Sequence, residues 1–162
     1  MTILAIHESP VGPLTLVSDG AALTGVYFAE SKHGGPPEAP AGEDKVILAA
    51  RKQLDAYFSG KRRAFDVPLA PRGTAFQTRV WNALTKIPYG ETKSYGAIAA
   101  MIGSPKAVRA VGAANGRNPI PILIPCHRVI GADGSLTGFG GGMARKEILL
   151  DLEKGALFPA GR

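Results

Sequence analysis

Cys126 is the only cysteine of the chain, and it lies between Pro125 and His127 in the segment PILIPCHRVIG. A free thiol has a pKa near ~8.5 and becomes a useful nucleophile when a base or a positive charge favours its thiolate form. His127 offers the base and Arg128 offers the charge. Adjacent side chains of an extended segment point to opposite sides, so we expect His127 to reach the sulfur through a water molecule. Glu153 is a candidate carboxylate for orienting the imidazole.

Other interpretations of this cysteine stay open. A lone cysteine in an apolar segment is usually an inert core residue. A cysteine hydrolase or acyltransferase built on Cys126 and His127 is a second alternative. One cysteine cannot form an internal disulfide. A tetrahedral zinc site would have to use this one cysteine or the three histidines with carboxylates, so we expect no zinc site. The glycine-rich segment lacks the Lys-Ser or Lys-Thr pair of a phosphate-binding loop, so we expect neither a metal nor a cofactor.

Positive charge is concentrated in the second part of the chain. Residues 1–70 contain seven Lys or Arg against eight Asp or Glu, whereas residues 71–162 contain twelve against five. Eight basic residues and one acidic residue, Glu91, lie from Arg72 to Arg128. This excess suits a polyanion such as a nucleic acid, although a solvated basic surface without a partner has the same composition.

Length and composition bound the class of protein. The 162 residues are 45% hydrophobic and 20% charged, which suits one substantial core or two small lobes. The first residues, MTILAIHESP, do not resemble a signal peptide, and no run reaches the roughly 18 apolar residues that a membrane helix needs. We expect a cytoplasmic protein without membrane association.

Residues 1–70 are expected to form a small α+β lobe. The segment SPVGPLTLVSDGAALTGVYFAE alternates β-favouring stretches with turn signals, which predicts an antiparallel hairpin or meander. Apolar residues at helical spacing predict a helix over 43–59, with Gly60 where it ends. AFDVPLA predicts a short strand, and PLAPRG predicts a linker between two lobes.

Residues 74–158 are expected to form a mostly helical lobe, so the fold as a whole is of the α+β class. Thr74 is predicted to cap a first helix, and SYGAIAAMIG predicts a short apolar helix after it. The next helix is predicted to begin at Pro105 with Ser104 as its N-cap, and this spacing is typical of a helix-turn-helix. A last helix is predicted over 143–154.

The second helix of this unit is rich in small residues, so few of its side chains would reach base edges in a major groove. The small residues are Ala107, Ala110, Gly112, Ala113 and Ala114. They allow a close backbone approach with Arg109 as the long projecting cation, which predicts a sequence-tolerant contact in a minor groove. A helical hairpin packed on the core is one alternative. A transcription regulator in which Cys126 is structural is another.

Several segments together resemble the O6-alkylguanine-DNA alkyltransferases, or methylated-DNA–protein-cysteine methyltransferases. They are IPCHRVIGADGSLTGFGGG, RAVGAANGRNPIPILIPCHRV, IPYGETKSYGAIA and GTAFQTRVW, with SPVGPLTL similar to the family's N-terminal hairpin. The resemblance covers most of the chain. It implies a DNA repair protein that moves the alkyl group of O6-alkylguanine, and also of O4-alkylthymine, irreversibly to Cys126. It implies no cofactor, a partner that is double-stranded DNA carrying O6-alkylguanine, and a monomer in the absence of DNA.

The resemblance also implies roles for the residues around the thiol. A water molecule, His127 and Glu153 would form the thiolate of Cys126. Tyr95 would lie beside the flipped nucleotide and donate a proton or hydrogen bond to guanine N3 as charge develops on the leaving base. Asn118 would brace the turns around the reactive segment, because an amide both donates and accepts.

The target carbon lies within a base stack, so the base must be extruded, and the family does so with its helix-turn-helix. Arg109 would fill the vacated space. The implied DNA-binding residues are Arg109, Tyr95, Ser104, Lys106, Ala110 and Gly112. The backbone carbonyl groups of Cys126 and Val129 would accept from the guanine amine. Phe139, where many members have tyrosine, would form an apolar wall, and the amide of Gly140, which replaces a larger residue, would face O6 and admit bulkier alkyl groups.

Overall fold

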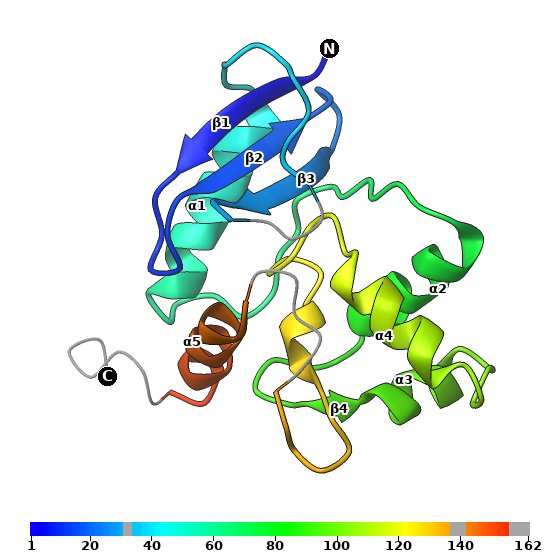
Figure 1. Cartoon of the computed structure of the whole chain (residues 1–162). Helices are drawn as coiled ribbons and strands as arrows, with labels where there is room; N and C mark the ends of the chain where they lie inside the picture. The colour runs from blue at the N-terminus through cyan, green and yellow to red at the C-terminus, as the bar shows by residue number, and fades with distance from the viewer. Residues whose placement is uncertain (31–33, 137–141, 156–162) are drawn as a thin grey trace.

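The N-terminal lobe is built on an antiparallel sheet of three strands (Figure 1). The computed structural model describes residues 1–30, 34–136 and 142–155. The strands are β1 (Ile3–His7), β2 (Leu14–Ser18) and β3 (Leu23–Phe28), paired in this order. Leu14 and Leu16 on β2 are fully buried, because alternate residues of a strand point to the same face of the sheet. The predicted meander is confirmed.

Helix α1 (Lys45–Phe58) packs on this sheet (Figure 1). Asp44 caps it, since its carboxylate accepts from the backbone N of Ile47 at 2.8 Å. Gly60 follows the end of the helix with φ of 78°, a conformation that glycine adopts without strain. The predicted helix is confirmed, and its inner face carries Tyr57 into the core with no exposed surface.

The segment 64–70 does not form the predicted strand. Leu69 makes a single isolated bridge to Leu23 on β3. In this bridge Leu23 N donates to Pro68 O at 2.8 Å and Ala70 N donates to Leu23 O at 2.9 Å. Pro68 has no N–H to extend the ladder, so the segment touches β3 once and passes into the second lobe.

Three helices pack against one another in the second lobe (Figure 1). They are α2 (Ala75–Leu84), α3 (Tyr95–Met101) and α4 (Val108–Gly116). Thr74 caps α2 as predicted and forms a capping box with Gln77. The indole Nε1 of Trp81 on α2 donates to the carbonyl oxygen of Ala114 at 2.9 Å, which fastens α2 to α4.

Helix α4 begins later than the sequence predicts. Its N-cap residue is Ala107, which has no side chain to cap with, instead of Ser104. The backbone N of Ala107 donates to Ser104 O at 2.9 Å and closes a turn across Pro105 and Lys106. Proline fixes the φ angle that the second position of such a turn requires, so the Ser-Pro pair forms the turn instead of the first helical residues. Helices α3 and α4 still contact each other as a helix-turn-helix.

The remaining elements of this lobe are a short turn, two short strands and the last helix. They are the 3-10 turn η1 (Cys126–Arg128), the two-residue parallel strands β4 (Lys93–Ser94) and β5 (Val129–Ile130), and helix α5 (Met143–Glu153). The last predicted helix is therefore confirmed. One hydrophobic cluster joins the two lobes, with Ile47 and Tyr57 from the first and Trp81 and Val129 from the second.

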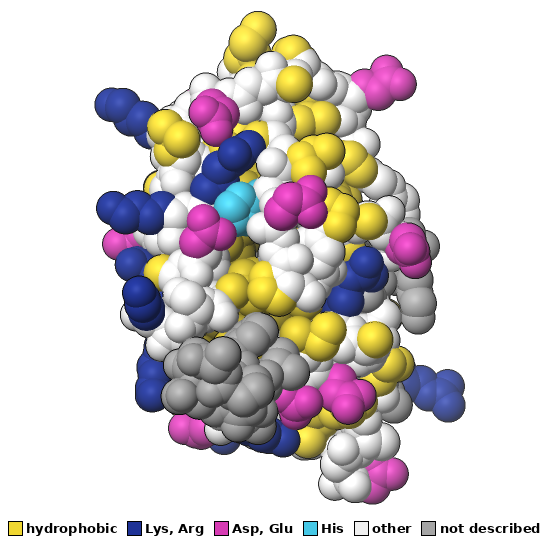
Figure 2. Space-filling model, turned by 90° about the vertical axis from the view of Figure 1, so that its left-hand side faces the viewer, with side chains coloured by type: hydrophobic (Ala, Val, Ile, Leu, Met, Phe, Trp, Pro, Cys, Tyr) yellow, Lys and Arg dark blue, Asp and Glu magenta, His cyan; other side chains and the backbone are white. Residues whose placement is uncertain are grey.

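The face of the molecule on the left of Figure 1 carries both charged and hydrophobic side chains. Figure 2 shows Lys or Arg and Asp or Glu side chains interspersed among hydrophobic patches on this face. Within the described residues no helix has the length and apolar character to cross a membrane. The same residues contain no group of three or more His, Cys, Asp or Glu that could bind a metal ion.

Candidate active site

Cys126 is buried, with 4% of its surface exposed, and it begins the turn η1. The segment is irregular here, and not extended as the expectation for the two side chains assumed. Arg128 N donates to Pro125 O at 3.0 Å, so the chain turns with about three residues per revolution. The side chains of Cys126 and His127 therefore diverge by roughly a third of a turn instead of pointing to opposite sides.

Glu153, the last residue of α5, accepts hydrogen bonds from four residues in a buried site. Nε2 of His127 lies 2.7 Å from Oε2, and Tyr57 Oη donates to the same oxygen at 2.6 Å. Arg128 is bidentate, with Nε 2.8 Å from Oε1 and Nη2 2.9 Å from Oε2. The backbone N of Gly90 adds a 3.3 Å bond to Oε1. The structure thus brings the predicted His127 and Glu153 into direct contact and adds Arg128 and Tyr57 to them.

Burial and hydrogen bonding set the protonation states of His127 and Glu153. Burial by itself would raise the pKa of Glu153, but hydrogen bonds from His127 and Arg128 outweigh it and hold the pKa well below its usual range. Burial lowers the pKa of His127, although the bond to Glu153 opposes the shift. At neutral pH the pair is a carboxylate and a neutral imidazole. A carboxylate can only accept, so the imidazole proton lies on Nε2 and the lone pair on Nδ1.

The thiol of Cys126 is protonated at rest. Burial raises its pKa to about 11, while a hydrogen bond from Asn118 and the positive charge of Lys146 act in the opposite direction. The sequence assigned the positive field to Arg128, but that guanidinium is paired with Glu153. Lys146 therefore supplies the cation that favours thiolate, and sequence analysis missed it.

Lys146 lies on α5 with no exposed surface, and its Nζ donates to the carbonyl oxygen of Val129. Burial lowers its pKa to about 8. It precedes Glu153 by seven residues, which places both charged side chains on the helix face that also buries Leu149. This spacing was the available signal, because a charge on the apolar stripe of a predicted helix requires a buried partner.

Asn118 braces the turn that precedes Cys126. Its Nδ2 donates to Ile124 O at 2.7 Å, and its Oδ1 accepts from Ile120 N at 3.0 Å. Between these contacts Ile122 has φ of 76°, in the left-handed region that β-branched residues rarely adopt. The amide thus holds a strained turn immediately before the reactive residue.

The residues predicted to bind DNA gather on the helix-turn-helix. Arg109 is exposed on α4 and forms no hydrogen bond or ion pair with the described residues. Tyr95 begins α3 and is half-buried, and a Cβ on Gly112 would lie 3.8 Å from its ring. Ala110 is exposed on α4, Ser104 is half-buried before the turn, and Lys106 is exposed within it.

The predicted substrate pocket is described in part. Val129 is fully buried at the start of β5. Its carbonyl oxygen accepts from Lys146, and that of Cys126 accepts from Asn115 Nδ2 at 3.3 Å. The Cys126 carbonyl also accepts from the backbone N of Val129, so donors within the protein already engage both of its lone pairs. Phe139 and Gly140, with the glycine-rich loop around them, lie outside the described residues.

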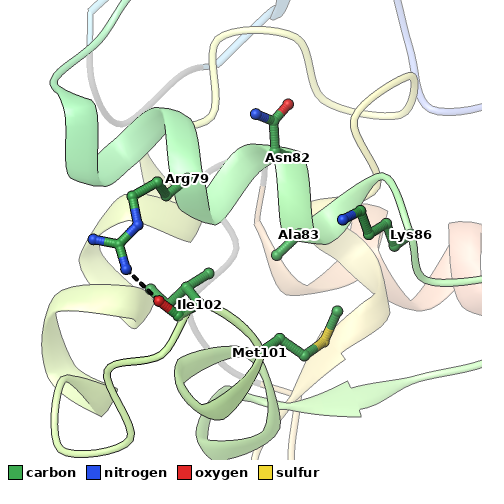
Figure 3. A pocket seen from close by; sticks show the side chains of 6 residues that line it. All are labelled: Arg79, Asn82, Ala83, Lys86, Met101 and Ile102. Carbon is green, nitrogen blue, oxygen red and sulfur yellow. Dashed lines mark hydrogen bonds between the residues drawn. The ribbon is translucent and has the colours of Figure 1, made fainter.

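A surface pocket between α2 and the end of α3 contains none of the predicted site residues (Figure 3). It is lined by Arg79, Asn82, Ala83, Lys86, Met101 and Ile102. Arg79 points across the gap and donates to the carbonyl oxygen of Ile102, as Figure 3 shows. This contact fixes the end of α3, and with it the helix-turn-helix, against α2.

Comparison with known proteins places this fold in one class, the methyltransferases that act on methylated DNA. Residues 3–71 match the ribonuclease-like domain, and residues 75–155 the DNA binding domain, of 6-O-methylguanine DNA methyltransferase. A methylated-DNA–protein-cysteine methyltransferase of Methanosarcina acetivorans is 54% identical over 150 residues, or 92% of this chain and 96% of that protein. The crystal structure of Mycobacterium tuberculosis OGT in complex with DNA has a TM-score of 0.87 and 51% identity, covering 99% of this chain and 96% of that chain.

The chain therefore belongs to the 6-O-methylguanine DNA methyltransferase family, whose curated members are named for transfer of a methyl group from DNA to a protein cysteine. A second relative, from Mycobacterium bovis, is 54% identical over 147 residues, which cover 91% of this chain and 89% of the relative. These matches extend over both lobes, so the resemblance seen in the sequence is confirmed at the level of the family.

Proposed function

We propose that this protein repairs double-stranded DNA by moving the alkyl group of O6-alkylguanine, and of O4-alkylthymine, to its own Cys126 in one irreversible turnover. The observation that carries the proposal is the buried contact of His127 with Glu153 next to a buried thiol in a member of this family. A thiol with a pKa of about 11 needs such a base, because almost none of it is thiolate at neutral pH.

His127 acts as the base through its Nδ1 atom. This atom is buried and has no hydrogen-bond partner within the described part of the chain, although Nε2 is bound to Glu153. Buried polar atoms are nearly always hydrogen-bonded, so a water molecule between Nδ1 and the sulfur of Cys126 is the expected partner. Through this water the thiol proton passes to Nδ1, and the carboxylate of Glu153 stabilises the imidazolium that forms.

The alkyl transfer is a single displacement. The thiolate of Cys126 attacks the alkyl carbon, a carbon–sulfur bond forms as the bond to O6 breaks, and the guanine leaves with the electron pair of that bond. Tyr95 donates a hydrogen bond or proton to N3 of the leaving base. The product at Cys126 is a thioether, which has no simple route back to a thiol, so one molecule repairs one base.

The helix-turn-helix brings the base to the thiol. The alkyl carbon lies inside the stack of duplex DNA, so the nucleotide must rotate out before the sulfur can reach it. The small side chains of α4, including the exposed Ala110, let this helix approach the minor groove closely, and Arg109 is free within the described structure to enter the vacated space. The exposed Lys106, in the turn before α4, contacts a phosphate.

Two features of organisation belong to the same proposal. The chain divides into a scaffold lobe, 1–70, and a DNA-binding and alkyl-acceptor lobe, 74–158, which the separate family matches to 3–71 and 75–155 support. The protein acts as a monomer in the absence of DNA. In support of this, Cys126, His127 and Glu153 all come from one chain.

The test is to incubate the protein with duplex DNA carrying O6-methylguanine and then to measure the mass of the peptide that contains Cys126 by mass spectrometry. We expect a mass gain of one methylene, at no more than one per molecule, and the same product from O4-methylthymine. Cys126→Ser should bind the duplex without changing mass. A wild-type Cys126 that stays unmodified while DNA is bound would contradict the proposal and favour a DNA-binding regulator.

A further inference from the structure

Tyr57 connects the N-terminal lobe to the reactive cluster. It lies on α1, has no exposed surface, and donates from Oη to Oε2 of Glu153 at 2.6 Å, across 96 positions of sequence. Three neighbouring aromatic side chains pack against its ring. Its centroid lies 5.2 Å from that of Phe58, 5.4 Å from that of Phe65 and 6.1 Å from that of Tyr89. Tyr57 therefore enters the cluster from α1 of the N-terminal lobe, and aromatic rings from both lobes hold its side chain.

The hydroxyl shares one oxygen atom with the base of the proposed reaction. Oε2 of Glu153 accepts from Tyr57 at 2.6 Å, from His127 Nε2 at 2.7 Å and from Arg128 Nη2 at 2.9 Å. A carboxylate has about two lone-pair sites on each oxygen, so these donors compete for the same electron density. The Tyr57 bond therefore both fixes the plane of the carboxylate and limits how strongly Oε2 attracts the Nε2 proton of His127.

Tyr57 remains a donor throughout the pH range of the reaction. Burial, together with the negative charge of Glu153 and the hydrogen bond to it, raises the pKa of this phenol well above its usual value of 10.0. The group thus carries its proton whenever Glu153 is a carboxylate.

We infer that Tyr57 is a positioning residue for the alkyl transfer: its hydroxyl holds the Glu153 carboxylate that orients His127, so the N-terminal lobe takes part in the chemistry. The inference rests on the proposed roles of His127 and Glu153. It extends those roles, because it gives the N-terminal lobe, which does not contain Cys126, a defined function at the reacting centre.

The experiment compares two tyrosine variants of the full chain, Tyr57→Phe and Tyr89→Phe. Both remove one hydroxyl and keep the ring, but no hydrogen bond from the Tyr89 hydroxyl to Glu153 occurs among the described residues. The rate constant for alkyl transfer from free O6-benzylguanine is measured across pH, and affinity for undamaged duplex DNA is measured beside it. Tyr57→Phe should slow the transfer roughly tenfold without changing DNA affinity. Tyr89→Phe should match the wild type within about twofold.

The pH profile separates positioning from mere packing. Without the Tyr57 donor, Oε2 attracts the Nε2 proton more strongly, so the pKa of His127 rises and the acid limb of the rate profile moves to higher pH. Site-specific replacement of Tyr57 by 3-fluorotyrosine keeps the fold and makes a stronger donor, so the same limb should move to lower pH. Loss of packing would not produce opposite shifts.

Several outcomes would overturn the inference. One is a Tyr57→Phe rate and acid limb equal to those of the wild type. Another is a Tyr57→Phe variant that has a lower melting temperature but the pH–rate profile of the wild type. A third is an acid limb that does not move when 3-fluorotyrosine replaces Tyr57. His127→Ala and Glu153→Gln are measured in parallel. If both retain the wild-type rate, the proposed function itself fails. If both are slow while Tyr57→Phe is not, only the role of Tyr57 is wrong.

Discussion

Arg128 binds both carboxylate oxygens of Glu153, and its remaining Nη1 donates to the carbonyl oxygen of Ile87 at 2.8 Å. The pair is buried and ties the turn that begins with Cys126 to the end of α5. Bidentate geometry and full hydrogen bonding offset the cost of removing two charges from water. The same carboxylate thus serves the stability of the fold and the base of the proposed reaction.

Removing the charge of Glu153 should destabilise the protein strongly. Glu153→Gln leaves the guanidinium of Arg128 buried without a counter-charge, so we expect the free energy of unfolding to fall by about 3–5 kcal/mol. Urea denaturation at neutral pH measures it. Glu147→Gln, on the exposed side of the same helix, is the matched control and should change stability by less than about 0.5 kcal/mol. Similar losses in the two variants would show that the buried pair contributes little.

Stability should fall in two stages on acidification. The folded-state pKa of His127 lies below its usual 6.5, so its contribution is complete above that pH and is lost as pH falls through the folded value. The pKa of Glu153 lies below its usual 4.5, so a second contribution is present above pH 4.5 and is lost at lower pH. Urea denaturation at a series of pH values measures both. Glu153→Gln should lack the second stage, and stability independent of pH below 6.5 would contradict the assignment.

Replacing Lys146 should make the thiol harder to ionise. Lys146→Met removes the cation that opposes the effect of burial, so the pKa of Cys126 should rise further above its present value of about 11. Because the chain has one cysteine, the rate of its alkylation by iodoacetamide at a series of pH values reports this thiol. Lys154→Met, just beyond the end of α5, is the control and should leave the titration unchanged. A titration identical in both variants would mean that Lys146 does not act on the thiol.

Arg109→Ala should slow repair of a base within duplex DNA by roughly tenfold or more, because extrusion needs a side chain to fill the stack. Reaction with free O6-benzylguanine requires no extrusion and should keep its wild-type rate. Rates of protein methylation and benzylation measure the two. Lys52→Ala removes the same charge from an exposed site on α1 and should affect neither. Equal losses on both substrates would argue against the role of the arginine.

Binding to undamaged duplex DNA should weaken steeply with salt, because cations of the helix-turn-helix replace counterions at phosphates. Lys106→Ala should weaken binding and reduce the slope of log affinity against log salt by about 0.9, the value for one phosphate contact. Fluorescence anisotropy of labelled DNA at several salt concentrations measures it, with Lys52→Ala as the control that leaves the slope unchanged. A flat salt response of the wild type would show that DNA docks elsewhere.

Local sequence patterns were enough to predict most of the elements. The N-cap at Thr74, the glycine at 60 and the alternation of β-favouring stretches with turn signals act over a few residues, so α1, α2 and the meander follow from the sequence. Two local predictions were wrong at prolines, because a proline can begin a helix, form a turn or interrupt a strand. Pro105 opens a turn instead of α4, and Pro68 reduces a predicted strand to one bridge.

The sequence by itself determined the family, the single thiol and its neighbouring imidazole, because residue identity and short spacing carry that information, and it offered Glu153 only as a candidate. Only the tertiary structure decided which charges meet. It paired Arg128 with Glu153 instead of leaving it to the thiol, placed Lys146 near Cys126, and brought Tyr57 from the other lobe to the same carboxylate. The reason is physical: a buried charge takes whichever partner the packing brings within hydrogen-bond distance, and contacts across 96 residues leave no periodic signal in the chain.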